Sequence, residues 1–196
     1  MLLAALAVAC HKAQVPPLPR LAGDAKVVAF GDSLTFGTGA SPSHAYPDEL
    51  QALIGRTVVN AGVPGETTAG GRERLPGVLD ENKPALVILC EGGNDMLRQD
   101  DRGQQRANLD AMIRTIRERG IAVVLLGVPE PKIFVGKSEP MYAELAKQYQ
   151  LPLENDVIPE VEGDRSRKSD QIHPNDQGYK DMAQAVARLL HAAGAV

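Results

Sequence analysis

The apolar and polar residues of this chain follow two different periods. Short apolar runs are typical of buried strands. Such runs lie near residues 26–30, 57–60, 85–90, 121–127 and 151–154. Segments with apolar residues at helical spacing lie between these runs, and this alternation predicts a parallel sheet.

Three of the intervening segments show helical spacing clearly. The segment 104–119 carries apolar residues on one face, and Gly120 ends it. A second helix contains Met141 and Tyr149, and a last one runs from about Asn175. Five parallel strands joined by right-handed crossovers predict a three-layer α/β/α sandwich with the flavodoxin-like strand order 2-1-3-4-5. Ligands bind such sheets beyond the carboxyl ends of the strands, here between the first and third strands.

Length and composition indicate one globular domain. The chain has 196 residues, of which 43% are hydrophobic and 23% charged, so it can bury a core without disulfides or metal. We place this domain at residues 26–196. Before it, Pro16, Pro17 and Pro19 predict that residues 11–25 form an extended tether and not a packed element.

Residues 1–25 are predicted to combine an export signal with this tether. The apolar stretch Met1–Ala9 is too short to span a bilayer and has the length of a signal-peptide core. The junction at Cys10 resembles a bacterial lipoprotein signal, in which the cysteine is acylated and tethers the protein to a membrane. No Lys or Arg precedes the apolar core, so acylation of Cys10 and simple cleavage have equal weight. We expect an exported protein, either periplasmic or anchored as a lipoprotein.

Charge and cysteine usage exclude several function classes. The net charge is −4 and no run of Lys or Arg forms a positive stripe, which argues against a nucleic-acid partner. Cys10 and Cys90 form neither a disulfide framework nor a metal set, and Cys90 ends an apolar run, so we expect a core residue. No metal-ligand set, phosphate-binding loop or dinucleotide motif follows a predicted strand, so we expect chemistry without metal or cofactor.

Residues suited to acyl transfer follow three of the predicted strands. Ser33 comes directly after the first strand, at the carboxyl edge of the sheet. Gly65 lies in a glycine-rich loop after the second strand, where backbone N–H groups can approach a ligand closely. Asn94 follows the third strand, and its side-chain amide can donate to an oxyanion. Each motif taken alone is more often ordinary turn or helix-cap chemistry.

A fourth motif lies near the C-terminus and reads Asp170-Gln171-Ile172-His173-Pro174. A single tight turn brings an acid and an imidazole at this spacing within hydrogen-bond reach. Asp170 can then hold His173 in one tautomer and stabilise its positive form. The other histidines of the chain have no comparable setting.

These four segments, in this order and at these strand ends, resemble the SGNH or GDSL hydrolase family, nearest to its bacterial periplasmic thioesterases, lysophospholipases and arylesterases. The likeness extends from Lys26 to the last helix. It implies that Ser33 is the nucleophile and that Asp170 and His173 complete a catalytic triad. It also implies an oxyanion hole formed by the Ser33 N–H, the Gly65 N–H and the Asn94 side chain.

The resemblance implies a serine esterase that hydrolyses acyl or aryl esters, thioesters or lysophospholipids through an acyl-enzyme. The expected partner is a small-molecule ester, and the chain is expected to act as a monomer. Gln171 departs from the family pattern, since a glycine frequently stands there, and this is expected to alter the loop shape. A carbohydrate O-acetylesterase stays open, as does a surface-tethered binding protein that kept the fold and lost catalysis.

The substrate pocket is expected to be lined by the loop after Asn94 and by residues 129–136. The candidates are Asp95, Met96, Leu97, Ile133, Phe134 and Val135. The apolar members of this set favour an acyl or aryl group over a sugar. With equal weight, the same residues belong to the core or stabilise the loops.

Overall fold

The computed structural model describes residues 15–130 and 136–196. They contain a five-stranded parallel sheet with the order β2-β1-β3-β4-β5, which confirms the predicted fold class and strand order. The strands are β1 (Lys26–Gly31), β2 (Thr57–Gly62), β3 (Leu86–Cys90), β4 (Ala122–Leu126) and β5 (Leu153–Glu154). Neighbouring strands are all parallel, so their carboxyl ends lie at one edge of the sheet.

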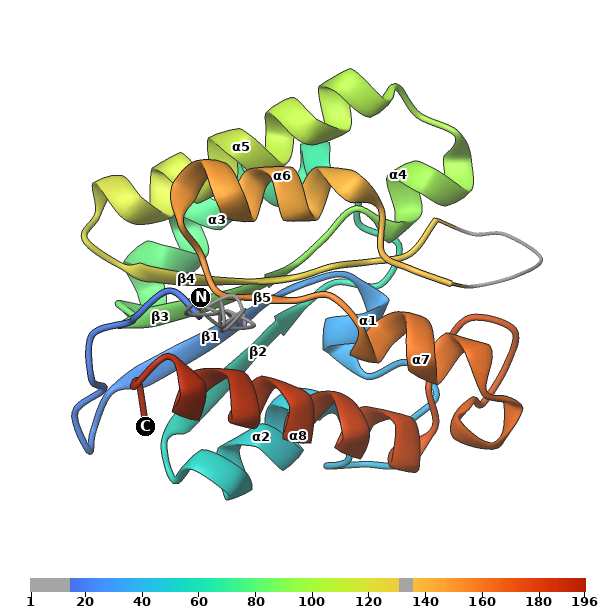
Figure 1. Ribbon diagram of the computed structural model, residues 1–196, viewed down its shortest axis with the longest axis horizontal. Coiled ribbons are helices and arrows are strands. Elements are labelled where there is room, and N and C mark those ends of the chain that lie inside the picture. Colours follow the sequence, from blue (N-terminus) through green and yellow to red (C-terminus); the bar gives the residue numbers. More distant parts are fainter. Residues whose placement is uncertain (1–14, 131–135) are drawn as a thin grey trace, which may run out of the picture.

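Helices cover both faces of the sheet and complete the three predicted layers (Figure 1). One face carries α3 (Thr68–Asn82), α4 (Gly93–Arg98), α5 (Arg102–Glu118) and α6 (Pro140–Tyr149). The other carries α1 (Ser33–Phe36), α2 (Tyr46–Ile54), α7 (Val157–Gly163) and α8 (Asp176–Ala192). A short 3-10 turn, Arg165–Arg167, connects α7 to the loop before α8.

The two central strands form the middle of the core. Residues 27–30 of β1 and 86–90 of β3 are buried, because helices pack against both faces of the sheet. Cys90 is a free, fully buried thiol, as expected of a core residue. Burial raises the pKa of this thiol well above its ordinary value, so the sulfur stays protonated and unreactive.

Side-chain caps set the starts of two predicted helices. Helix α5 begins slightly before its predicted start, because the Asp101 carboxylate accepts the N–H of Gln104 at 2.7 Å. Helix α8 begins directly after Asn175, whose side chain accepts the N–H of Gly178 at 3.1 Å. The second cap fixes where the chain leaves the motif that contains His173.

The segment before β1 differs from the expected tether. Leu21 is buried, and the N–H groups of Leu18 and Leu21 donate to the carbonyl groups of Ala193 and Ala195, each at 2.8 Å. Residues 15–25 therefore pack along the end of the chain instead of standing free. Cys10 and the predicted signal segment lie outside the described residues, and no helix within the described part is long and apolar enough to cross a membrane.

Candidate active site

Three loops converge at the carboxyl edge of the sheet. Ser33 follows β1, and two glycine loops, residues 63–67 and 91–94, follow β2 and β3. A cleft of about 730 Å³ opens where these loops meet the segment that precedes α8. Ser33, Gly65, Asn94 and His173 all line this cleft, although they belong to four motifs that are separate in the sequence.

Ser33 is held by a tight turn into α1. The Asp32 carboxylate accepts the N–H of Leu34 at 3.0 Å and so caps this short helix. A Cβ at Gly31 would lie 2.1 Å from the Cys90 carbonyl oxygen and 2.3 Å from Thr35 Oγ1, so only glycine fits before the turn. The close approach of β1 to β3 therefore depends on Gly31 and sets the position of the serine.

Ser33, His173 and Asp170 form a continuous hydrogen-bonded chain. His173 Nε2 lies 3.1 Å from Ser33 Oγ, and His173 Nδ1 lies 2.7 Å from Asp170 Oδ2. The carboxylate can only accept, so in the neutral ring Nδ1 carries the proton and Nε2 is free to accept from the serine hydroxyl. This is the arrangement that a histidine base requires.

Asp170 also closes the turn that presents His173. Its Oδ1 accepts the N–H groups of Ile172 and His173, each at 2.7 Å. Partial burial acts to raise the pKa of Asp170, but the bonds from the His173 ring and from both N–H groups outweigh it and lower that pKa to about 2. The acid is therefore ionised across the range in which a histidine titrates. Gln171 has no positive φ, so this turn closes without the glycine that often stands there.

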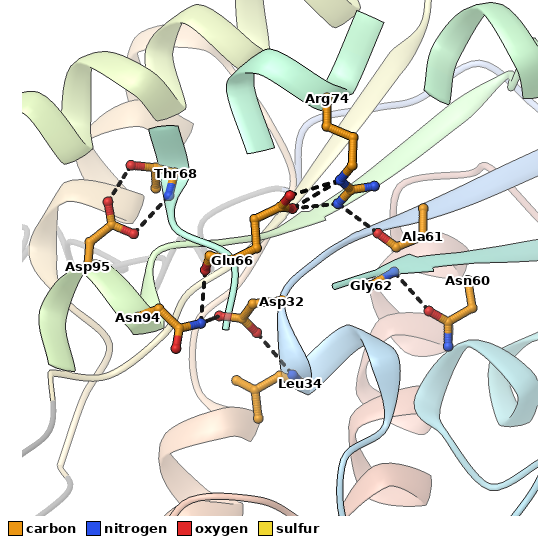
Figure 2. Close-up of polar contacts among 10 residues, drawn as sticks. All are labelled: Asp32, Leu34, Asn60, Ala61, Gly62, Glu66, Thr68, Arg74, Asn94 and Asp95. Carbon is orange, nitrogen blue, oxygen red and sulfur yellow. Dashed lines mark hydrogen bonds and ion pairs between the residues drawn. The ribbon is translucent and has the colours of Figure 1, made fainter. Parts of the chain in front are cut away.

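The Asn94 side-chain amide lies between Asp32, in the turn after β1, and Glu66, in the glycine loop after β2 (Figure 2). Its Nδ2 donates to the Glu66 carbonyl at 2.9 Å and lies 3.3 Å from Asp32 Oδ2. Gly65 has a φ of +79°, and an added Cβ there would meet only the Arg98 guanidinium, 4.0 Å away. Gly65 is therefore uncrowded, and it lines the same cleft as Asn94.

Comparison with known proteins places the chain in a family. A model of the GDSL-like lipase/acylhydrolase family matches residues 29–180. The protein belongs to this family. It is 34% identical to Esterase TesA of Pseudomonas aeruginosa over 158 residues. This matched region covers 76% of this chain and 79% of TesA. The protein is 31% identical over 178 residues to an arylesterase of Vibrio mimicus, which spans 84% of this chain and 88% of the relative.

Solved structures agree with this GDSL assignment. The crystal structure of TesA has a TM-score of 0.73 at 29% identity, over 86% of this chain and 99% of that one. AlinE4, described as an SGNH-hydrolase family esterase, has a TM-score of 0.63 at 30% identity, over 86% and 95% of the two chains. The resemblance read from the sequence is confirmed, and the protein is a carboxylic ester hydrolase of this family.

The predicted pocket residues of this GDSL hydrolase divide into three groups. Leu97 lines the cleft, together with Pro129 from the second predicted segment. Asp95 and Met96 are buried away from it, so their assignment to the pocket is wrong. Asp95 instead accepts the N–H and the hydroxyl of Thr68, at 2.8 and 2.5 Å. Residues 133–135 lie outside the described part of the chain.

Several cleft residues were missed by the sequence reasoning. They are Leu34, Thr38, Pro64, Val128, Glu162, Gln171 and Ile172. Most stand next to a motif that was recognised, and Val128 could have been found because it follows the end of β4. Glu162 lies on α7, and only the packing of that helix brings it to the cleft.

Asp32, the residue before the serine, has an unusual pKa because it is buried. Burial raises the pKa of Asp32 to about 6, although the N–H of Leu34 and the charge of His173 lower it and the neighbouring carboxyls raise it further. Asp32 therefore does not behave as an ordinary surface carboxylate. Within the described residues, no group of three or more His, Cys, Asp or Glu side chains is arranged to hold a metal ion.

Proposed function

We propose that this GDSL hydrolase cleaves neutral acyl or aryl esters through an acyl-enzyme formed on Ser33. The observation that carries the proposal is the unbroken contact from Asp170 through His173 to the Ser33 hydroxyl at the cleft. His173 takes the hydroxyl proton as Ser33 Oγ attacks the ester carbonyl, and Asp170 stabilises the imidazolium. The tetrahedral intermediate collapses when His173 returns the proton to the leaving alcohol or thiol.

Water completes the reaction by the same route. His173 removes a proton from water, which attacks the acyl-enzyme carbonyl, and then returns that proton to Ser33 Oγ as the acid leaves. Cleavage therefore consumes one water molecule and regenerates the free serine. The reaction needs no group beyond these side chains and the oxyanion donors.

The oxyanion of each intermediate is assigned to the N–H groups of Ser33 and Gly65 and to the Asn94 amide. Neither N–H group donates a hydrogen bond to another described residue. Asn94 uses its Nδ2 for a 2.9 Å bond to the Glu66 carbonyl and makes only a longer contact of 3.3 Å with Asp32 Oδ2, so its second amide hydrogen is the one assigned to the oxyanion. Donors fixed before the reaction stabilise the developing charge without reorganisation.

The cleft favours a modest apolar acyl or aryl group. Its volume of about 730 Å³ is in the range of small-molecule sites, and its walls include the aliphatic residues Leu34, Leu97, Val128 and Ile172. These aliphatic residues match an acyl or aryl group better than a sugar, so a carbohydrate O-acetylesterase finds less support. Three of the relatives are named for esters, thioesters or lysophospholipids and one is named an acetylxylan esterase, so the leaving group remains part of the proposal.

The first test of the proposed function is Ser33→Ala. We expect loss of p-nitrophenyl ester turnover by a factor of about 10⁴–10⁶ and loss of labelling by an organophosphonate, because no other group can form the acyl-enzyme. Thermal unfolding followed by circular dichroism checks that the fold is intact. Turnover retained by a folded Ser33→Ala variant would contradict the assignment, and an unlabelled wild-type protein would favour a non-catalytic binding module.

A substrate panel then defines the acyl group. It consists of p-nitrophenyl esters from acetate to palmitate, with an acyl-CoA and an acetylated sugar alongside. Preference for the acetylated sugar would favour the acetylesterase alternative.

We also propose that the segment before Cys10 directs export, with Cys10 either acylated or cleaved off with the signal. The support is the apolar run that ends at this cysteine. Mass spectrometry of the mature N-terminus distinguishes a diacylglyceryl cysteine from a plain cleaved end.

A further inference from the structure

A group of buried carboxyls lies beneath the two glycine loops. It consists of Asp32, Glu66, Glu91 and Asp95, which are close enough to influence one another's charge. Figure 2 shows Asp32, Glu66 and Asp95 of this group around Asn94. The triad mechanism uses none of them directly, so each needs a reason to be buried here.

Glu66 is compensated by an arginine. Arg74 Nε donates to Glu66 Oε1 at 2.9 Å, and Arg74 Nη2 donates to Oε2 at 2.5 Å and to the Ala61 carbonyl at 3.0 Å (Figure 2). The guanidinium also lies 4.1 Å from the centre of the Phe30 ring. This two-point ion pair holds Glu66 as a carboxylate, which can accept hydrogen bonds but cannot donate one.

Glu91 has no such compensation. It is fully buried, and neither of its carboxyl oxygens receives an N–H or O–H from a described residue. Asp95 by contrast accepts two bonds from Thr68, and Asp32 accepts the N–H of Leu34. Space around Glu91 is limited, since a Cβ on Gly71 would lie only 3.2 Å from Glu91 Oε1.

The Glu66 and Glu91 carboxyls pack against the same turn of α3, since a Cβ on Gly70 would lie 3.6 Å from Glu66 Oε1 and a Cβ on Gly71 would lie 3.2 Å from Glu91 Oε1. The group beside the buried Glu91 carboxyl is therefore the Glu66 carboxylate. Two carboxyl groups can share a hydrogen bond only when one of them carries a proton. Burial, the negative charge of Asp32 and the bond to Glu66 all raise the pKa of Glu91 well above its ordinary value. Since Arg74 keeps Glu66 ionised, the proton belongs on Glu91, and the Glu91 O–H donates to Glu66.

This bond joins the two loops that carry the oxyanion donors. Glu66 directly follows Gly65, and its carbonyl accepts the Asn94 amide at 2.9 Å. Glu91 starts the loop that ends at Asn94, and its own carbonyl accepts the Tyr142 hydroxyl at 2.7 Å. The side chains of Glu66 and Glu91 therefore add a second connection below the Asn94 contact.

We propose that Glu91 is a positioning residue, whose protonated carboxyl donates to Glu66 and fixes the distance between the Gly65 N–H and the Asn94 amide. The inference rests on the proposed function, because it assumes that these two groups bind the oxyanion. Oxyanion stabilisation depends on donors that are already in place, and a displacement of about 1 Å can cost up to about 10²-fold in rate. Glu91 does not line the cleft, so substrate binding should not depend on it.

The decisive experiment compares Glu91→Gln with Glu91→Leu. Glutamine keeps a donor in nearly the same place, so kcat should stay within about twofold of the wild type. Leucine fills the space without a donor, so kcat should fall by about 10–10² fold while KM changes little. Glu66 keeps its two bonds from Arg74 when leucine removes the Glu91 donor, so we expect Glu91→Leu to fold, and its thermal midpoint is measured beside kcat.

Controls separate positioning from general damage. Cys90→Ala changes the buried side chain directly before Glu91, at the end of β3, and leaves both carboxyl groups in place. It should lower the thermal midpoint but not kcat. Equal kcat in wild type and a folded Glu91→Leu variant would overturn the inference, as would equal damage from Gln and Leu. Activity retained by Ser33→Ala would instead contradict the proposed function itself.

The pH profile provides a second test that needs only the wild type and Glu91→Gln. Deprotonation of Glu91 would create a negative charge that is repelled by Asp32, Glu66 and Asp95. Arg74 cannot compensate for this charge, because it is already paired with Glu66. The kcat of the wild type should therefore decline at alkaline pH, whereas the Gln variant should keep a plateau. Parallel alkaline declines in the two proteins would overturn the inference even if Glu91→Leu does not fold.

Discussion

The loop that carries Asp170 and His173 differs from the two glycine loops in burial and in the range of its contacts. This histidine loop, residues 164–175, is held by bonds between near neighbours, such as the Ser169 N–H to the His173 carbonyl at 2.9 Å. The Asp170 side chain is 54% exposed. In the glycine loops Glu66 and Glu91 are mostly or fully buried, and so is Asp95 directly after the second loop. Asp95 and Asn94 bind residues far away in the sequence.

This difference shows that the two halves of the active site act under different dielectric conditions. Charges in a buried network interact strongly, and an unpaired group there is costly. An exposed carboxylate is partly screened by water, so its effect on an imidazolium is weaker. We infer that Asp170 acts mainly through geometry, by holding the His173 turn, while the glycine loops act through donors that a buried polar network holds in place.

The largest effect expected from this contrast is that of Asn94→Ala. Removal of the amide takes away one preorganised oxyanion donor, and kcat should fall by about 10²–10³ fold with little change in KM. Steady-state kinetics with a p-nitrophenyl ester measure both constants. A loss expressed mainly in KM would mean that Asn94 binds the substrate in its ground state and does not stabilise the oxyanion.

A smaller effect is expected for Asp170→Asn. The amide oxygen can still accept the N–H groups of Ile172 and His173, so the turn survives, but the charge beside the imidazolium is lost. The amide NH2 then faces His173 Nδ1 and favours the tautomer in which Nε2 carries the proton and cannot accept from Ser33. Where the triad acid is buried, such a change costs about 10⁴-fold. For the exposed Asp170 we expect a loss of about 10–10² fold in kcat.

Comparing Asp170→Asn with Asn94→Ala tests the idea directly. If the aspartate variant loses more activity than the asparagine variant, exposure does not weaken the triad acid in this protein. Salt provides a matched readout, because screening by 1 M NaCl should reduce the difference in kcat between Asp170→Asn and wild type. The Asn94→Ala defect should stay unchanged in salt.

The parts of this fold that local patterns determine could be predicted from the sequence. Apolar runs and glycine positions were enough to place the strands, most clearly β1, β3 and β4, which lie between helices and are buried on both faces. The Asp170 to His173 turn is equally local, because the acid and the ring are three residues apart. Residues 15–25 were misjudged, because their partners Ala193 and Ala195 lie at the other end of the chain.

The remaining errors come from geometry that no local pattern encodes. Asp95 and Met96 follow Asn94 in sequence, yet α4 begins at Gly93 and its rotation turns both residues inward while Leu97 faces the cleft. The Glu66–Glu91 pair joins two loops that lie on separate strands and approach each other only in the folded sheet. Glu162 reaches the cleft only through the packing of α7.

Glu162 gives the smallest expected effect. Burial raises its pKa to about 7, with Lys168 acting to lower that pKa and Asp32 to raise it further, so Glu162 is neutral below pH 7 and charged above. The charged form faces a cleft that we assign to apolar groups. For a neutral ester, kcat/KM of wild type relative to Glu162→Gln should therefore fall by about twofold to fivefold as pH rises through 7. Taking the ratio at each pH cancels every pH effect that the two proteins share.

The stability of the wild type relative to Glu162→Gln should also fall as pH rises. A carboxyl whose pKa is raised in the folded state favours folding at low pH, and this contribution is lost as pH rises from the unfolded value near 4.5 through about 7. Thermal midpoints of wild type should therefore fall relative to Glu162→Gln across that window. Glu160→Gln, an exposed glutamate on the same helix, is the matched control and should show neither trend. A flat activity ratio from pH 5 to 9 would mean that Glu162 stays in one charge state and does not influence the cleft.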